Sequence, residues 1–135
     1  MGEVRKVYIM RGVSGSGKST KARELAGTTG MIHSTDDYFM KDGVYKFDPR
    51  LLGRNHMRNF SAFKDSLNRN VLIVICDNTN SRHWEYKKYE EEAKNHGYEV
   101  EIVQMPHPEP AVAAKRSAHG VPETTIRRLL TRWED

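Results

Sequence analysis

Eight residues near the start of the chain most constrain its fold, because residues 12–19 read GVSGSGKS and match the phosphate-binding pattern GxxxxGKS in full. They lie between a strand-like apolar run and a segment that favours a helix from about Lys18. Glycines let successive backbone N–H groups converge on phosphates, and the following helix directs its positive N-terminus at the same anion. The pattern predicts a nucleoside triphosphate site; the alternative is a flexible Gly/Ser loop that ends in Lys-Ser by coincidence.

The same motif assigns roles to individual residues. We expect Lys18 to reach the β- and γ-phosphates and the Ser19 hydroxyl to bind Mg²⁺, so ATP and Mg²⁺ are the predicted cofactors. The residues predicted to line the nucleotide site are Gly12, Val13, Ser14, Gly15, Ser16, Gly17, Lys18, Ser19 and Thr20.

Length and composition limit the other possibilities. The 135 residues suit one domain, residues 1–135, built around a single sheet. The net charge of +4 suits a polyanionic partner, although ATP alone accounts for part of it. The single Cys76 ends an apolar run and has no partner for a disulfide, which favours a buried, reduced core residue.

No part of the sequence resembles a membrane segment. Nowhere does it approach the ~18 continuous apolar residues of a membrane span, and residues 1–6 lack the apolar region of a signal peptide. We therefore expect a soluble cytoplasmic protein, in the host-cell cytoplasm if the protein is viral, with no membrane partner.

Four apolar runs, at residues 4–10, 31–34, 71–76 and 98–105, alternate with helical patterns and predict parallel βαβ units. Residues 71–76 are apolar throughout, as in a strand covered on both faces, whereas residues 99–103 alternate as they do near a sheet edge. The prediction is an α/β, three-layer P-loop fold with a parallel sheet in the order 2-3-1-4.

The longest helical pattern, residues 49–70, has two distinct faces. One face is expected to pack in the core and carries Leu52, His56, Phe60, Phe63 and Leu67. The other carries Arg50, Arg54 and Arg58, which would line an acceptor groove or form an ordinary solvated face.

Acidic residues follow two of the predicted strands, and ligands of open parallel sheets bind at the carboxyl ends of the strands. Phosphoryl transfer needs a carboxylate that accepts the proton of the acceptor hydroxyl, and Asp36 or Asp37 fits that role; the alternative is a solvated turn. Asp77 follows the third apolar run, where it would hold Mg²⁺ or merely form a turn that caps the next helix.

Cations are also required, because negative charge builds up on the transferring phosphoryl group. Lys115 and Arg116 lie on a short helical segment between a Pro-rich and a Gly-containing break, which suggests a helical lid over the phosphates. His119 is a second possible contact from this lid, and a surface basic pair is the alternative interpretation.

Four segments in this order resemble the P-loop polynucleotide kinases, typified by the bacteriophage 5′-hydroxyl kinase and by kinase domains of eukaryotic ubiquitin-ligase-binding proteins. The segments are residues 12–20, 34–39 (STDDYF), 77–80 (DNTN) and 115–122 (KRSAHGVP), so the resemblance covers nearly the whole chain. It implies transfer of the ATP γ-phosphate to a nucleic-acid 5′-hydroxyl, as in DNA or RNA end processing and repair. The resemblance also implies that Asp36 is the general base, that Thr79 touches the acceptor strand and that Arg116 belongs to the lid.

The chain departs from the phage pattern at two positions. Phe39 and His119 stand where the phage enzyme has arginines, and both changes match the eukaryotic branch better. Phe39 could instead stack on a base. The residues predicted to bind the acceptor are Asp37, Phe39, Thr79 and Arg54. Two other functions remain open at this stage: a small-molecule kinase on the same fold, and a non-catalytic ATP-dependent binding module.

Overall fold

The computed structural model describes residues 4–135. The expectation that the N-terminus lacks a signal peptide therefore lies outside the described residues where it concerns residues 1–3. The strands are β1 (Lys6–Arg11), β2 (Met31–His33), β3 (Met40–Lys41), β4 (Val44–Tyr45), β5 (Ile73–Asp77) and β6 (Glu99–Gln104). The α-helices are α1 (Lys18–Ala26), α2 (Leu52–Asn68), α3 (His83–Asn95), α4 (Pro110–Arg116) and α5 (Glu123–Thr131). Two 3₁₀ helices, η1 (Thr35–Phe39) and η2 (Pro49–Leu51), precede β3 and α2.

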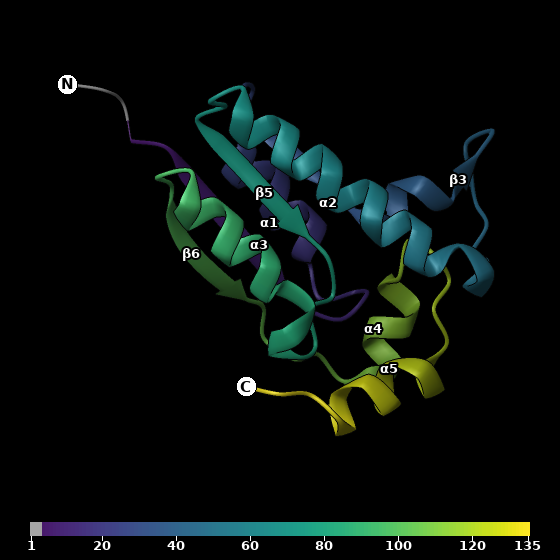
Figure 1. The fold of residues 1–135 in the computed structure, drawn as a ribbon. Coiled ribbons are helices and arrows are strands. Elements are labelled where there is room, and N and C mark those ends of the chain that lie inside the picture. The colour runs from purple at the N-terminus through teal and green to yellow at the C-terminus, as the bar shows by residue number, and fades with distance from the viewer. Residues whose placement is uncertain (1–3) are drawn as a thin grey trace.

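The central sheet has the order β2-β5-β1-β6, and all of its strand pairs are parallel. This confirms the predicted order 2-3-1-4 of the four apolar runs. Helix α1 packs on one face of the sheet, while α2 and α3 cover the other (Figure 1). The predicted three-layer α/β architecture is therefore correct.

Alternation of side chains along β1 and β5 explains the three layers. Val7 and Ile9 point into one buried cluster with the side chains of α2 and α3. Met10, from the same strand, points into the opposite cluster with Ala22 and Ala26 of α1. Because both faces are covered, the central strands need apolar residues at successive positions, as the sequence pattern indicated.

Helices α4 and α5 lie beyond the carboxyl ends of the strands and form the predicted helical lid (Figure 1). Their own small core contains Val13 from the P-loop, Ala113 from α4 and Ile126 from α5, all fully buried. The lid is therefore docked on the phosphate-binding loop by apolar contacts.

The structure corrects the core prediction for α2 at one position. Phe63 and Leu67 are buried as predicted, but Leu52 is 39% exposed, because it lies at the rim of a surface pocket instead of under the sheet.

Cys76 is buried and free, as expected, and burial raises the pKa of its thiol to about 12. Within residues 4–135, no helix is long and apolar enough to cross a membrane.

Candidate active site

The P-loop connects β1 to α1, and its backbone requires glycine at two positions. Gly15 and Gly17 have φ angles of 83° and 88°, in the left-handed region that other L-residues avoid. Gly17 is also the N-cap of α1, so the positive end of that helix faces the loop. Sequence and geometry agree here on an anion-binding turn.

Three side chains converge beside this loop. The Lys18 ammonium donates to Asp77 Oδ1 at 2.5 Å, and the Ser19 hydroxyl donates to Asp77 Oδ2 at 3.3 Å. Parallel pairing of β1 with β5 causes this meeting, because it sets Asp77, the last residue of β5, opposite Met10 near the end of β1. Asp77 is only 4% exposed and makes these contacts, not the helix cap that was the alternative interpretation.

The side chains beside the P-loop can be compared with the groups that Mg²⁺ and a triphosphate require. Lys18 supplies a cation, while Ser19 and Asp77 supply adjacent hydroxyl and carboxylate oxygens, the ligands that Mg²⁺ prefers. The Ser16 hydroxyl is buried in the loop without a hydrogen-bond partner among the described residues. The donor set therefore fits a magnesium-bound triphosphate, although residues 4–135 contain no group of three or more His, Cys, Asp or Glu that could hold a metal ion by themselves.

A pocket of about 210 Å³, the P-loop pocket, opens above these side chains. Its P-loop and α1 walls include most of the predicted nucleotide-site residues together with Arg23, which the sequence analysis did not identify. Arg116 and His119 line the pocket from the lid side. The remaining wall consists of Asp36 and Thr79.

The lid approaches the P-loop closely. A Cβ atom added to Gly15 would lie 2.1 Å from the backbone oxygen of Ala113 in α4. The Ser14 and Ser117 hydroxyls are 2.6 Å apart, which adds a hydrogen bond between the loop and the lid. Glycine at position 15 thus serves both the backbone turn and the docking of the lid.

Asp36 lies in η1, shortly after β2, and has two polar neighbours, one from the nearby hairpin β3–β4 and one from the lid. The Tyr45 hydroxyl donates to Asp36 Oδ1 at 3.2 Å, and His119 Nε2 lies 3.7 Å from Asp36 Oδ2. The rings of Tyr45 and His119 are stacked, with centroids 3.9 Å apart. Burial, followed by the charge of Asp36, raises the pKa of Tyr45, so the phenol remains a hydrogen-bond donor near neutral pH.

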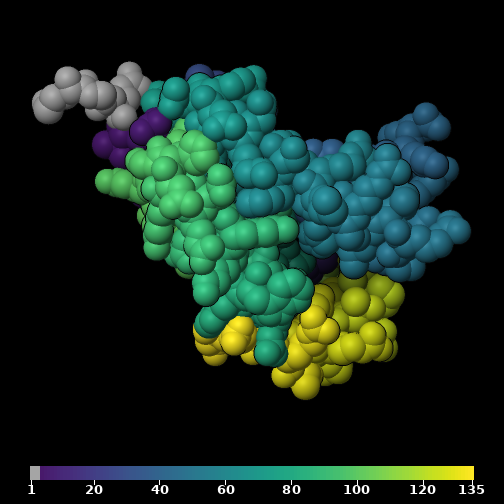
Figure 2. Space-filling model, in the orientation of Figure 1, coloured from purple at the N-terminus to yellow at the C-terminus, as the bar shows by residue number. Residues whose placement is uncertain are grey.

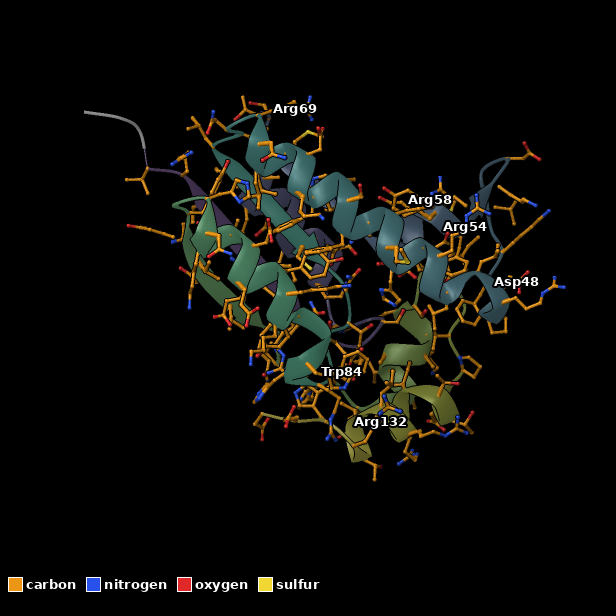
Figure 3. All side chains as sticks on the ribbon, in the orientation of Figure 1. Asp48, Arg54, Arg58, Arg69, Trp84 and Arg132 are labelled. Atoms are coloured by element: carbon orange, nitrogen blue, oxygen red, sulfur yellow. The ribbon has the colours of Figure 1, made fainter. Side chains whose placement is uncertain are left out.

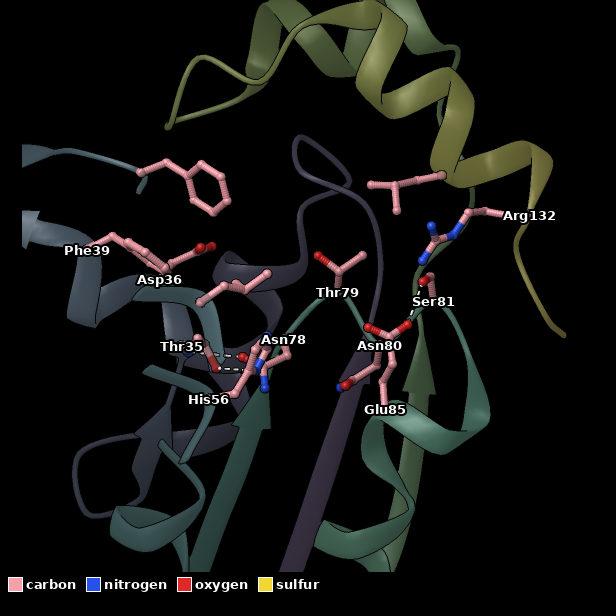
Figure 4. Close-up of a pocket in the computed structure, with 13 residues that line it drawn as sticks. Thr35, Asp36, Phe39, His56, Asn78, Thr79, Asn80, Ser81, Glu85 and Arg132 are labelled. Carbon is pink, nitrogen blue, oxygen red and sulfur yellow. Dashed lines mark hydrogen bonds between the residues drawn. The ribbon is translucent and has the colours of Figure 1, made fainter. Parts of the chain in front are cut away.

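A second pocket, of about 310 Å³, lies on the other side of Asp36 (Figure 4). Asp36 and Thr79 line both pockets and therefore form their common boundary. Figure 2 shows the molecular surface hollowed between the blue segment, which includes the start of α2, and the yellow lid. The other polar groups of the second pocket include His56, Asn78 and Arg132.

Hydrogen bonds below η1 hold Asp36 in place. The Thr35 backbone N–H donates to Asn78 Oδ1 at 2.9 Å, and the Thr35 hydroxyl lies 3.2 Å from His56 Nδ1 (Figure 4). Tyr45, Thr35 and His56 were not predicted as site residues, because their roles depend on tertiary contacts that no local motif encodes.

The structure does not bring the other predicted acceptor residues together in one pocket. Asp37 and Arg54 line a separate depression with Arg58 and are not among the lining residues of the P-loop pocket. Burial, then the charges of Asp77 and Asp36, raise the pKa of Asp37. Phe39 is 3% exposed and packs against Phe47 at 5.1 Å between ring centroids, although it also lines the second pocket.

Comparisons with known proteins give a consistent result. A family model described as "AAA domain" matches residues 7–134. The chain is 37% identical over 134 residues to NEDD4-binding protein 2 of Homo sapiens, covering 95% of this chain but only 8% of that protein. Two solved structures have a similar fold at 18% identity. The Pnkp1/Rnl/Hen1 RNA repair complex has a TM-score of 0.74 and covers 98% of this chain and 45% of the matched chain. A gluconokinase from Sinorhizobium meliloti 1021 has a TM-score of 0.64, covering 99% of this chain and 78% of that one.

Proposed function

The chain belongs to the AAA domain family and has an α/β P-loop kinase fold; on that premise, we propose that it transfers the γ-phosphate of ATP to the 5′-hydroxyl end of a polynucleotide. The observation that carries the proposal is the position of Asp36 on the common boundary of the P-loop pocket and the second pocket. A carboxylate between a phosphate-binding site and an acceptor site has the position that a general base for phosphoryl transfer needs.

The nucleotide half of the proposed reaction uses the P-loop pocket. Backbone N–H groups of the loop and Lys18 would hold the phosphates, while Ser19 and Asp77 would hold Mg²⁺. When bound, Mg²⁺ would neutralise negative charge on the phosphate oxygens. Arg116 and His119 line the same pocket from the lid and would offset charge on the transferring group.

The transfer half takes place at the boundary. The acceptor oxygen forms a bond to the γ-phosphorus, the bond from that phosphorus to the β,γ-bridging oxygen breaks, and ADP leaves with the electron pair. Asp36 accepts the proton that the acceptor hydroxyl loses. The hydrogen bond from the Tyr45 hydroxyl orients the Asp36 carboxylate, which keeps this base aligned with the acceptor hydroxyl during transfer.

A polynucleotide acceptor has support of several kinds. The net charge of +4 favours a polyanion, and a chain of similar fold belongs to an RNA repair complex. Thr79 and Asp36 line the second pocket together with Glu85 of α3 and Leu129 of α5. DNA or RNA end processing is the corresponding cellular role.

A small-molecule kinase is the second candidate, because the fold is also similar to that of a gluconokinase and the second pocket has a volume of about 310 Å³. That volume falls at the lower end of the range for metabolite pockets. The two candidates differ in salt dependence, since a strand that releases counterions on binding binds less tightly as salt rises.

The test measures transfer of labelled γ-phosphate from ATP and Mg²⁺ to 5′-hydroxyl DNA and RNA oligonucleotides, with gluconate and shikimate as small-molecule acceptors. We expect labelling of oligonucleotides and an acceptor KM that rises with salt. A 5′-phosphorylated oligomer is the blocked control. If small molecules are labelled and oligonucleotides are not, the acceptor is a small molecule and the polynucleotide proposal is wrong. ATP binding without transfer to any acceptor would indicate a binding module.

A further inference from the structure

A third hollow, which we call the Trp84 groove, continues from the second pocket across the surface. Its volume is about 490 Å³, and it shares Leu52, His56, Glu85 and Arg132 with the second pocket. These shared walls make the two hollows neighbours, and Asp36 lines the second pocket. The residues that only the Trp84 groove contains are Gly53, Trp84 and Lys88.

Trp84 is the most conspicuous feature of this groove. It lies in the first turn of α3 and is 73% exposed, more than the other large apolar side chains of the described residues. One exposed aromatic ring by itself signifies little. Here, however, the indole lines a groove that adjoins the pocket of the proposed general base, and Figure 3 shows it beside Arg132 at the junction of α3 and α5.

The charged groups of the groove are mainly positive. Lys88 follows Trp84 by one helical turn, and its ammonium lies 4.8 Å from the centre of the Phe60 ring. The Arg132 guanidinium makes no hydrogen bond or ion pair with any residue among 4–135. Two cations therefore face a groove whose wall also carries an aromatic ring.

The one carboxylate of the groove already has donors. Glu85 Oε1 accepts hydrogen bonds from the Ser81 hydroxyl at 2.6 Å and from the Arg82 backbone N–H at 2.9 Å. It thus caps the start of α3 and does not cancel either cation by a direct ion pair. His56, which both hollows share, has a lowered pKa: burial is the main cause, the charge of Lys88 lowers the pKa further, and the charges of Glu85 and Asp36 oppose it.

Stacking surfaces with nearby cations are the features that bind single-stranded nucleic acid without regard to sequence, because every base has a flat face and every linkage a phosphate. Resting on the proposed function, we propose that the Trp84 groove binds the single-stranded segment that follows the reacting 5′ end. Trp84 stacks on a base of this segment, and Lys88 and Arg132 contact its phosphates. The 5′-terminal nucleotide itself occupies the second pocket.

The test compares acceptors of increasing length. For the parent protein, KM should fall from a nucleoside 3′-phosphate to 5′-hydroxyl oligomers of several nucleotides. Trp84→Ala should raise the KM of the oligomers about five- to a hundredfold, with kcat and the KM of the single nucleotide unchanged. Met57→Ala is the matched control, since Met57 is 71% exposed on α2 and lines none of these hollows.

The two cations are tested separately. Lys88→Gln should weaken oligomer binding and reduce its salt dependence, whereas Lys87→Gln should not, because Lys87 is the neighbouring exposed residue of α3 but lies outside the groove. An unchanged length dependence in both Trp84→Ala and Lys88→Gln would overturn the proposed groove while leaving the kinase intact.

A binding measurement separates failure of the groove from failure of the proposed reaction. The anisotropy of a labelled oligonucleotide gives its Kd for the parent and for Trp84→Ala without any transfer. Weaker binding by the variant supports the groove even if no acceptor is phosphorylated, and equal Kd values overturn it. Tryptophan fluorescence that is quenched on binding in the parent protein but not in Trp84→Ala, which retains only Trp133, should report the same contact.

Discussion

At the scale of single residues, Gly15 is the position where the P-loop and the lid depend most on each other. Its φ of 83° requires a residue that tolerates the left-handed region. Its missing side chain leaves room for the backbone of Ala113, which lies where a Cβ atom would be. A single residue thus meets a backbone and a packing requirement together.

Gly15→Ala is expected to separate the lid from the P-loop and to abolish stabilisation of the protein by Mg-ATP. Gly43→Ala is the matched control, because Gly43 has a φ of 78° with no atom within 4 Å of an added Cβ. Both variants bear the left-handed strain of about 1–2 kcal/mol, but only Gly15→Ala adds a collision with backbone. Thermal unfolding with and without Mg-ATP measures both effects, and equal nucleotide stabilisation in the two variants would contradict this account.

At the scale of elements, the lid and the hairpin β3–β4 complete a site that the sheet begins. Helices α4 and α5 are held through Val13 and Ile126, and the hairpin brings Tyr45 to Asp36 and His119. The small size of the lid core implies that the lid opens more easily than the sheet, because local opening follows local burial.

Ile126→Ala should therefore release the lid before it unfolds the protein. Removing a fully buried isoleucine costs about 2–5 kcal/mol, and here the cavity falls between α5, α4 and the P-loop. Hydrogen exchange should accelerate in α4 and α5 while the sheet stays protected. Leu67→Ala in the main core is the control and should lower global stability without selective exchange in the lid. Selective exchange in both variants, or in neither, would refute the separate lid core.

The fold was largely predictable from sequence because its strands are short apolar runs with fixed spacing. The same reasoning did not identify the hairpin β3–β4, since its strands have two residues each and three of the four are exposed. Motif spacing located Lys18, Ser19 and Asp77, which the structure brings together. The contact of Tyr45 with His119 has no local signal, because it forms only when the hairpin meets the lid.

At the scale of the whole molecule, stability is linked to pH through the buried His33 and the half-buried His56. His33 at the end of β2 is 8% exposed, and its Nε2 lies 2.8 Å from the Ser66 hydroxyl in α2. Burial chiefly, with the positive charge of Arg69, lowers the pKa of His33 to about 4. The pKa of His56 is lowered in the same direction, again mainly by burial.

A lowered pKa in the folded state means that the unfolded chain takes up protons first as the pH falls. The stabilising effect of neutral His33 is therefore complete above pH 6.5 and is lost between pH 6.5 and about 4. The free energy of unfolding falls by about 3 kcal/mol over this pH range. Urea unfolding across this range should show the decline, and His33→Gln should flatten it, whereas His107→Gln, at an exposed position, should not. An equal decline in His33→Gln would assign the effect to other groups.

The central claim is that Asp36, at the boundary of two pockets, accepts the proton of the acceptor hydroxyl. The most direct measurement compares Asp36→Asn with Asp37→Asn in labelled γ-phosphate transfer to a 5′-hydroxyl oligonucleotide, with Mg-ATP binding measured in parallel. We predict that Asp36→Asn lowers kcat by about 10²-fold or more and still binds Mg-ATP, because a general base contributes 10²–10⁴-fold. Asp37→Asn should retain kcat, since Asp37 lies in a separate depression. Full activity of Asp36→Asn, or loss of activity only in Asp37→Asn, would contradict the account.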